Sequence, residues 1–343
     1  MKKQNVLNLI RYHGEQNDIA FRNEAYAIAQ DFAKNNDEEL AEYIIAQLSS
    51  VSSFTPQINE NDLSFFKKVS TDSSPLPLPD IIKDDVFGIV NAIKHNVGVN
   101  KFLFEGAPGT GKTETAKYLS EILHRELFSV SFTDIIDSKL GETSKNISKL
   151  FSQMNSFDHP DKVVFLFDEF DSIAMDRINS NDLREMGRAT SQILKEFDNL
   201  SSQVLLIATT NLFSNFEKAL TRRFDFIIDF NRYTKEDLLD VADIILDYYL
   251  DKFPQAGRNM RLFRKILSLL EIVPYPGELK NLIKVSLAFS KNNEPFDYLK
   301  RLYKTVTNTT SIDLKLLKIQ NFTLREIEIL TGISKSQAAR ELK

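Results

Sequence analysis

The segment 106–113, GAPGTGKT, constrains the fold of this chain more than any other part of it. It matches the pattern G-x-x-x-x-G-K-[ST], follows the apolar run 102–104 and precedes a stretch of helical character, 114–123. Its glycines let successive backbone N–H groups turn toward one anion, and the N-terminus of the following helix adds positive potential. The segment therefore predicts a loop between a strand and a helix that binds the phosphates of a nucleotide.

Residue types within this loop indicate separate tasks. The ammonium of Lys112 is suited to reach the β- and γ-phosphates, and the hydroxyl of Thr113 is suited to bind Mg²⁺. The other residues predicted to contact the nucleotide are Gly106, Ala107, Pro108, Gly109, Thr110, Gly111 and, at the start of the helix, Glu114. The predicted ligands are therefore ATP and Mg²⁺.

Short apolar runs alternate with helical patterns between about residues 81 and 230. Runs such as 163–167 and 204–208 lack polar alternation, which is typical of strands buried on both faces of a parallel sheet. After about residue 231 only helical patterns remain. We therefore predict an α/β fold, with a P-loop parallel sheet flanked by helices over 81–230 and a small helical lid over 231–305.

Two carboxylates, Asp168 and Glu169, directly follow the apolar run 163–167. A carboxylate at the tip of a buried strand beside the phosphate loop is placed to hold Mg²⁺, and its neighbour is placed to polarise an attacking water. We predict Asp168 as a metal ligand and Glu169 as the catalytic base. Asp171 is predicted to be structural, either as a helix cap or as the partner of an arginine.

The run 204–208 also ends in polar residues, the last of which is Asn211. We predict that the amide of Asn211 orients the lytic water beside Glu169. Shortly downstream, residues 219–225 read ALTRRFD and contain two adjacent arginines, Arg222 and Arg223.

These motifs, in this order and at these spacings, resemble the AAA family of ATPases over roughly residues 80–295. The resemblance matches 106–113 to Walker A, 163–169 to Walker B, Asn211 to a sensor and 221–225 to the arginine-finger segment. In that family the arginines project into the ATP site of a neighbouring subunit. The resemblance therefore implies that Arg222 and Arg223 act in trans on ATP hydrolysis, within a nucleotide-dependent homo-oligomer that is usually a hexamer. Surface ion pairs with Asp225 or Glu217 are the alternative.

Two lysines stand where related ATPases carry functional residues. Lys280 lies where some relatives place a second sensor near the γ-phosphate, whereas another alignment matches 277–279 to a segment lining the adenine pocket and leaves Lys280 as an exposed lysine. Segment 138–143 resembles the first pore loop, but Lys139 takes the position of the aromatic residue that threading enzymes use. An ammonium does not grip a passing backbone as a flat ring does, and it suits an acidic polypeptide or a phosphate backbone better.

Segments before residue 81 differ in character from the rest. Residues 1–55 are predicted to be a helical N-terminal segment, since apolar positions follow helical spacing over 17–48, with a break at 35–37. Residues 56–80 are predicted to be a Ser/Pro-rich linker, because prolines at alternate positions favour an extended chain.

The C-terminal tail, 306–343, is predicted to be helical, and its part 322–340 resembles a helix-turn-helix. Gly332 would form the turn and Ser334 would cap the second helix. The residues that would face the groove are Lys335, Ser336, Gln337 and Arg340. Glu328, however, stands where such units bury a small apolar residue, and 315–343 carries six Lys/Arg against three Glu. The alternatives are therefore nucleic-acid binding through 311–343 and a plain helical hairpin that packs on the lid or on a partner.

Composition excludes several kinds of site. The chain has no cysteine, which rules out disulfides and Cys-ligated zinc or iron–sulfur centres. We predict a cytoplasmic protein without membrane contact, because no stretch approaches the roughly 18 apolar residues of a membrane span and the N-terminus lacks the core of a signal peptide. The net charge of −5 does not indicate a general nucleic-acid surface.

The leading hypothesis is a ring-forming ATPase that uses hydrolysis to remodel a macromolecular partner, in the first place a protein recognised through residues 1–50. One alternative is an ATP-gated binding module that loads or releases a DNA-bound partner through 311–343. Another is an ATPase subunit that works with a separately encoded effector such as a protease.

Overall fold

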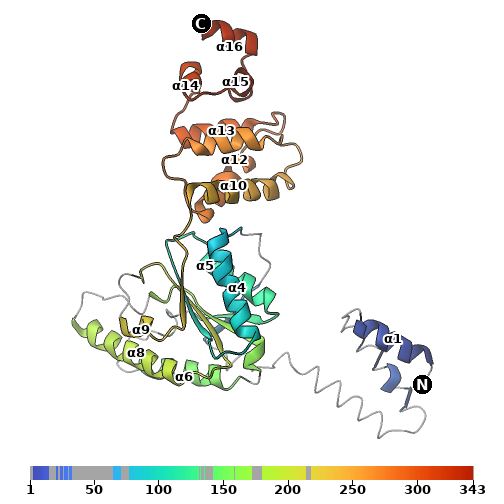
Figure 1. Ribbon diagram of the computed structural model, residues 1–343, viewed down its shortest axis with the longest axis vertical. Helices are drawn as coiled ribbons and strands as arrows, with labels where there is room; N and C mark the ends of the chain where they lie inside the picture. The colour runs from blue at the N-terminus through green and yellow to red at the C-terminus, as the bar shows by residue number, and fades with distance from the viewer. Residues whose placement is uncertain are drawn as a thin grey trace. The chain divides into compact units, whose positions relative to one another are not determined.

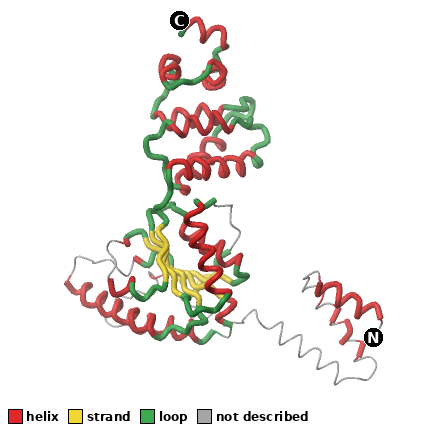
Figure 2. The backbone as a smooth tube through the Cα atoms, viewed as in Figure 1, coloured by secondary structure: helices red, strands yellow, loops and turns green. Residues whose placement is uncertain are grey.

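The computed structural model of the protein contains a sheet with helices on both faces, followed along the chain by a series of helices (Figure 1, Figure 2). The structure describes residues 3–14, 21, 24–25, 27–29, 31–32, 65–70, 77–130, 132, 135, 142–157, 159–171, 180–213 and 218–342. The chain divides into two units, Met1–Ser64 and Phe65–Lys343. No helix among the described residues is both long and apolar enough to cross a membrane.

The first unit is helical where it is described. Helix α1 spans Lys3–Gly14, and the described residues between 21 and 32 are also helical. The side chain of Asn8 donates a hydrogen bond of 3.3 Å to the carboxylate of Glu24, which links these two segments. The part of the predicted helical segment that follows its break at 35–37 lies outside the described residues.

The sheet in the second unit has the strand order β1-β3-β4-β5-β2-β6. Its strands are β1 (Phe66–Lys68), β2 (Lys101–Glu105), β3 (Glu126–Val130), β4 (Val163–Phe167), β5 (Leu205–Thr210) and β6 (Phe226–Asp229). Strand β1 is antiparallel to β3, and all the other neighbours are parallel. The predicted parallel sheet is confirmed. Because β4, β5 and β2 are parallel neighbours, the segments that follow their carboxyl ends meet at one edge of the sheet.

Helices cover both faces of the sheet, which explains why its inner strands lack polar alternation. These helices are α4 (Asp80–Lys94), α5 (Lys112–Ile122), α6 (Glu142–Asn155), α8 (Ser180–Asp198) and the short α9 (Lys218–Thr221), and a 3₁₀ turn η2 (Pro160–Lys162) precedes β4. Helices α4 and α5 pack on one face, where alternate strand residues form a single buried cluster with them. On the other face the ring of Phe167 meets Phe151 of α6 at 5.7 Å, and Phe170 stacks on Phe197 of α8 at 6.0 Å.

The helices after the sheet share one hydrophobic cluster. They are α10 (Lys235–Leu250), α11 (Met260–Ser268), α12 (Pro276–Ala288), α13 (Asp297–Thr307), α14 (Leu314–Ile319), α15 (Leu324–Thr331) and α16 (Lys335–Glu341). Leu317, Ile327 and Ala338 bring the last three helices into the cluster of the first four. The ion pair between Lys265 and the buried Glu326, at 2.8 Å, adds a polar link between these two groups of helices. The boundary predicted at residue 305 stays a prediction.

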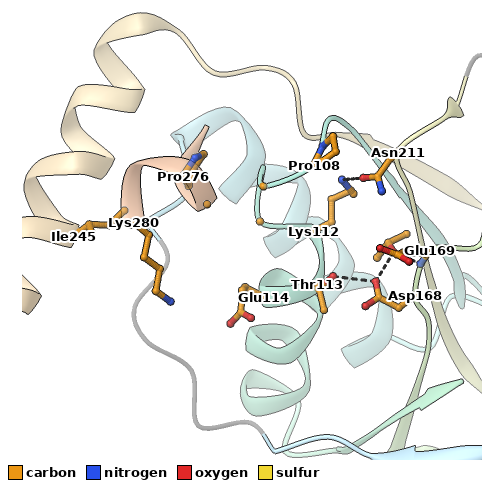
Figure 3. A pocket seen from close by; sticks show the side chains of 14 residues that line it. Pro108, Lys112, Thr113, Glu114, Asp168, Glu169, Asn211, Ile245, Pro276 and Lys280 are labelled. Carbon is orange, nitrogen blue, oxygen red and sulfur yellow. Dashed lines mark hydrogen bonds between the residues drawn. The ribbon is translucent and has the colours of Figure 1, made fainter. Parts of the chain in front are cut away.

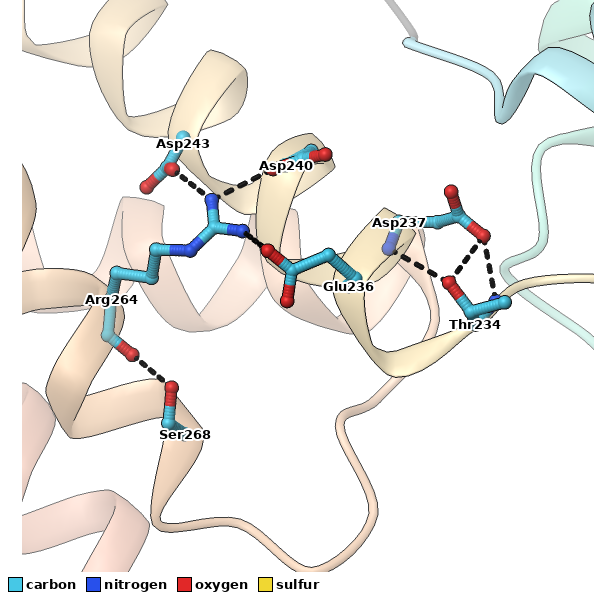
Figure 4. A network of polar contacts seen from close by, with 7 residues as sticks. All are labelled: Thr234, Glu236, Asp237, Asp240, Asp243, Arg264 and Ser268. Carbon is cyan, nitrogen blue, oxygen red and sulfur yellow. Dashed lines mark hydrogen bonds and ion pairs between the residues drawn. The ribbon is translucent and has the colours of Figure 1, made fainter.

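A polar network fixes the first two helices of this region to each other (Figure 4). Arg264 of α11 forms ion pairs with three acids of α10: Glu236, Asp240 at 2.7 Å and Asp243 at 2.6 Å. Burial raises the pKa of Asp243, although the hydrogen bond from Arg264 opposes this shift. Helix α10 itself begins with a capping box, in which Thr234 and Asp237 bond each other's backbone N–H groups.

Candidate nucleotide site

Side chains from several separate segments surround one cavity of about 370 Å³ beyond the carboxyl ends of β2, β4 and β5 (Figure 3). Its volume lies within the usual range of small-molecule sites. The residues that line it are Pro108, Gly109, Gly111, Lys112, Thr113, Glu114, Asp168, Glu169, Thr209, Asn211, Ile245, Pro276, Gly277 and Lys280. The structure therefore brings most of the predicted site residues to a single cavity, with helix α12 of the lid on one side.

The predicted phosphate loop leaves β2 and enters α5 through glycines with a left-handed backbone. Gly109 has φ +78° and Gly111 has φ +101°, conformations that residues with a side chain rarely adopt. A Cβ on Gly106 would also lie 3.0 Å from the Cβ of Phe230. These glycines are thus required by the path of the backbone, as the sequence pattern predicts.

Lys112 is buried at the centre of this loop. Its ammonium donates hydrogen bonds to the carbonyls of Gly106, at 2.6 Å, and Ala107, at 2.9 Å, and to Oδ1 of Asn211, at 2.8 Å. Burial lowers the pKa of Lys112, and the nearby carboxylates of Asp168, Asp171 and Glu169 oppose that shift. The predicted sensor residue and the predicted phosphate-binding lysine are therefore in direct contact.

The two predicted carboxylates follow β4 and are held by hydroxyl groups. Thr113 donates to Oδ1 of Asp168 at 2.9 Å, and Thr209 at the end of β5 donates to the same oxygen at 2.6 Å. The hydroxyl of Thr209 also accepts a hydrogen bond of 3.0 Å from the N–H of Glu169. Thr209 therefore forms hydrogen bonds to both Asp168 and Glu169, and this role was not predicted from the sequence.

Glu169 has a backbone conformation that is costly for a residue with a side chain. Its φ is +51°, in the left-handed region, where a non-glycine residue costs of order 1–3 kcal/mol. The contacts on either side hold it there, since Thr209 binds its N–H group and the next N–H, of Phe170, bonds to the carbonyl of Thr209 at 2.9 Å. The side chain of Glu169 is exposed and lines the cavity (Figure 3).

One of the two roles predicted for Asp171, an ion pair with an arginine, is not formed among the described residues, and the other, a helix cap, stays a prediction. One of its carboxylate oxygens is buried without a hydrogen-bond partner there. Its charge acts instead on Lys112, whose ammonium it helps to keep protonated.

Arg222 and Arg223 lie at the opposite edge of the sheet from the cavity. They precede β6, which is parallel to β2, and the N–H of Asp225 bonds the carbonyl of Lys101 at the start of β2. The length of β2 therefore separates the arginines from the phosphate loop by about 16 Å. Neither arginine lines the cavity within its own chain.

The two arginines differ in their contacts. Arg223 forms a two-pronged ion pair with Asp198, with N–O distances of 2.9 and 3.1 Å, and this contact holds the pKa of Asp198 below its ordinary value. Arg222 is exposed. The alternative partner Asp225 is engaged elsewhere, because its carboxylate accepts the N–H groups of Asn100 and Lys101, both at 2.9 Å. Glu217, the other alternative partner, lies outside the described residues.

Lys280 lies in the second turn of α12 and lines the cavity, as does Glu114 of α5, which forms an ion pair of 2.7 Å with Lys117 (Figure 3). The second predicted lysine, Lys139, and its loop lie outside the described residues.

Three further residues contact the phosphate loop and were not expected to do so. Asn231 accepts a hydrogen bond of 2.8 Å from the N–H of Ala107, and the hydroxyl of Tyr233 donates one of 2.9 Å to the carbonyl of Thr110. The N–H of Gly277 in α12 donates to the carbonyl of Gly109 at 2.8 Å. No local sequence pattern signals these contacts, because each joins segments more than 100 residues apart.

Comparison with known proteins finds similarity to one family of ATPases over the part of the chain that holds this site. Residues 102–232 match the model of the family described as ATPase family associated with various cellular activities (AAA). The uncharacterized AAA family ATPase y4kL of Sinorhizobium fredii is 39% identical over 133 residues, which are 39% of this chain and 39% of that protein.

The similar proteins include peroxisomal ATPases named PEX6. The one from Komagataella pastoris is 32% identical over 202 residues, or 50% of this chain and 17% of PEX6. The one from Kluyveromyces lactis is 26% identical over 296 residues, or 77% of this chain and 28% of PEX6. This chain therefore spans less than half the length of each of these three relatives.

Proposed function

We propose, from the match of residues 102–232 to the AAA family of ATPases, that the protein is an AAA ATPase that hydrolyses Mg-ATP at the cavity in Figure 3. In this proposal it works within an oligomer and uses the reaction to remodel a protein partner. The observation that carries the proposal is the meeting of Lys112, Asp168, Glu169 and Asn211 at one edge of the sheet. These residues come from three segments of the chain, and together they supply the groups that phosphoryl transfer to water requires.

Thr113 and Asp168 fit a magnesium ion. Their oxygens are 2.9 Å apart, and Mg²⁺ prefers oxygen ligands, usually one or two carboxylates together with substrate phosphates and water. The described residues contain no cluster of three or more acidic or histidine side chains that would form an all-protein metal site. The ion, when bound, would supply positive charge to the phosphates and to the leaving group.

The remaining residues have distinct tasks in this proposal. The ammonium of Lys112 binds the β- and γ-phosphates after it exchanges its contacts with the loop carbonyls. The carboxylate of Glu169 accepts a proton from the attacking water, and the amide of Asn211 orients that water. Lys280, across the cavity on α12, offers a further positive charge to the phosphates.

Arg222 and Arg223 complete the site from a neighbouring copy in this proposal. Within one chain they lie at the far end of β2, so they do not reach the cavity of their own subunit. A guanidinium from a second copy would stabilise the charge that develops on the γ-phosphate. A nucleotide-dependent ring, with six subunits by analogy with the family, satisfies this requirement.

The catalytic assignment is tested by Glu169→Gln, with the exposed lid residue Glu271→Gln as the matched control. We expect Glu169→Gln to retain ATP binding and to lose at least about 100-fold in kcat, because general-base catalysis contributes roughly 10²–10⁴-fold. The control should keep the wild-type rate. A Glu169→Gln variant that hydrolyses ATP at the wild-type rate would show that the assignment is wrong.

The trans assignment is tested by mixing two inactive variants. Glu169→Gln retains its arginines, and Arg222→Ala retains its carboxylate, so a mixed oligomer contains some sites with both groups. We expect ATPase activity to reappear on mixing and the oligomer to be larger with ATP than without it. No recovery on mixing, together with a monomer under all conditions, would exclude the trans arginine.

A second candidate function, binding of duplex DNA through the tail, is favoured by the local geometry of the last two helices. Thr323 starts α15 with a capping box, Gly332 ends it at φ +78°, and Ser334 caps α16. Helix α16 lies across α15 (Figure 1). Its exposed residues are Lys335, Ser336, Gln337, Arg340 and Glu341. A helix-turn-helix contacts the bases of the major groove with the exposed side of its second helix.

The test of this second function uses surface substitutions in the full chain, since removal of 311–343 would expose the hydrophobic cluster that the tail shares with the lid. Arg340→Glu is compared with Lys284→Glu, an exposed residue of α12. Binding to a labelled duplex that falls only with Arg340→Glu, and that weakens with salt, would support the second function. Equal binding by both variants would exclude α16 as the contact.

A further inference from the structure

The connector between the sheet and the lid contacts the phosphate loop through residues outside the lining of the cavity. Tyr233 and Asn231 both lie in this connector, between β6 and α10, and neither lines the cavity. Together with Gly277 they bind three groups of the loop backbone: the N–H of Ala107 and the carbonyls of Gly109 and Thr110.

Each of these contacts fixes the direction of a whole peptide unit. In a trans peptide the C=O of one residue and the N–H of the next lie in one plane and point in opposite directions. The hydroxyl of Tyr233 holds the Thr110 carbonyl at 2.9 Å, so the N–H of Gly111 points away from Tyr233. The amide of Gly277 holds the Gly109 carbonyl at 2.8 Å and directs the N–H of Thr110 in the same way.

The N–H groups of Thr110 and Gly111 donate no hydrogen bond within the part of the chain that the structure describes. Backbone amides of this kind are the donors with which a glycine-rich loop binds phosphate. Their direction, and therefore the phosphate affinity of the loop, depends on groups that belong to the connector and the lid.

Tyr233 also contacts both the sheet and the lid. Its ring packs against the hydrophobic cluster of the sheet and against that of the lid. It meets the ring of Tyr275, the N-cap residue of α12, edge to face at 5.9 Å. The phenol of Tyr233 is protonated at neutral pH and can donate, and burial raises its pKa further. Tyr233 therefore contacts the phosphate loop, the sheet and the start of α12 at the same time.

The approach of the lid to the loop at Gly277 is as close as two backbones allow. A Cβ on Gly277 would lie 2.9 Å from the Cα of Gly109 and 3.2 Å from its carbonyl oxygen. Backbone atoms cannot yield as the end of a flexible side chain does, so any side chain at 277 forces the lid away from the loop.

We propose that Tyr233 and the backbone of Gly277 are positioning groups for the phosphate-binding amides, through which the position of the lid sets the affinity of the loop for the nucleotide. This inference rests on the proposed ATPase site, and it names the residues by which that site is regulated. In an oligomer, a neighbour that displaces the lid would weaken nucleotide binding through these two contacts.

The first test is the Kd of ADP for the full chain with Tyr233→Phe, which removes only the hydroxyl. The matched control is Tyr275→Phe, because the hydroxyl of Tyr275 makes no hydrogen bond among the described residues. We expect Tyr233→Phe to raise the Kd about two- to tenfold, the value of one net hydrogen bond, and the KM for ATP by a similar factor. The kcat at saturating ATP should change less than about twofold, since the contact acts on ground and transition states alike.

A purely structural role of Tyr233 would change kcat and leave the Kd of ADP unchanged. Loss of folded protein lowers the amount of active enzyme, and hence kcat, without raising the Kd of the remainder. A wild-type Kd in Tyr233→Phe, or an equal rise in Tyr275→Phe, would overturn the proposal. Absence of ADP binding to the wild-type chain would instead refute the proposed nucleotide site itself.

The second test moves the lid with Gly277→Ala. The control is Gly88→Ala on α4, where an added Cβ would meet nothing within 4 Å. We expect Gly277→Ala to raise the Kd of ADP more than Tyr233→Phe does, and Gly88→Ala to leave it unchanged. An unchanged Kd in Gly277→Ala would show that the lid does not act on the loop through this contact.

Discussion

Thr209→Val is the substitution that most directly tests how the carboxylates of the site are held. The change keeps the shape of the side chain and removes one hydroxyl. That hydroxyl donates to Asp168 at 2.6 Å and accepts the N–H of Glu169 at 3.0 Å, and Thr209 is almost fully buried. Both partners therefore lose a contact that water does not readily replace.

The expected loss of stability in Thr209→Val follows from these two hydrogen bonds. A hydrogen bond to a charged group contributes about 1.5–3 kcal/mol, and a buried N–H left without an acceptor costs about 1–3 kcal/mol. The effects overlap, so we expect the free energy of unfolding to fall by about 2–4 kcal/mol. Glu169 also loses a contact that holds its backbone at φ +51°, a conformation of order 1–3 kcal/mol above the relaxed one. Its carboxylate will therefore move, and we expect kcat to fall at least about tenfold.

The assay combines steady-state ATPase rates, the Kd of ATP and thermal unfolding. Thr209→Ser is the rescue variant, because it retains the hydroxyl and loses only a methyl group. We expect Thr209→Ser to recover kcat to within about threefold of wild type, whereas the Kd of ATP stays within about threefold in both variants. A Thr209→Val variant with wild-type kcat, or a Thr209→Ser variant as slow as Thr209→Val, would refute this reasoning.

Three further predictions concern the stability of the fold. Burial raises the pKa of Glu326, but hydrogen bonds from Lys265 and Thr323 outweigh it and leave the pKa below its ordinary value of 4.5; Glu326→Gln should therefore cost about 1–3 kcal/mol at pH 7. Because the folded pKa is the lower one, this stabilisation is lost as the pH falls through it, and a difference in stability that does not shrink on acidification would contradict the assignment. Arg264→Met removes the partner of three acids and should lower the free energy of unfolding by about 1–2 kcal/mol, as measured by thermal unfolding. An unchanged free energy of unfolding would show that the network in Figure 4 contributes nothing to stability. Phe151→Ala should cost about 3–5 kcal/mol by denaturant unfolding, because the ring is fully buried against Phe167, and a loss below 1 kcal/mol would contradict that packing.

Local chemistry made much of the site predictable. A glycine-rich loop needs residues without side chains, and a carboxylate at the tip of an apolar strand is recognisable from its neighbours alone. The predicted segments 106–113 and 163–169 therefore coincide with the loop after β2 and the end of β4. Thr209 was visible as a polar residue at the end of a buried strand, but its two bonds depend on the pairing of β4 with β5.

Contacts between distant segments were not predictable in this way. The bonds of Asn231 and Tyr233 to the loop join residues 123 or more positions apart, and neither residue belongs to a pattern that indicates such a bond. The distance of Arg222 from its own cavity follows from the parallel pairing of β6 with β2, which composition and spacing do not reveal.

The sequence by itself thus determined the α/β class, the resemblance to the AAA ATPases and the positions of the candidate site residues, because glycine conformation, buried apolar runs and carboxylate placement are properties of short segments. Only the tertiary structure decided how those groups are held: Thr209 on the two carboxylates, Tyr233 and Gly277 on the phosphate loop, and the arginines at the far edge of the sheet. The physical reason is that hydrogen bonds of this kind act over about 3 Å in space, whatever the separation along the chain.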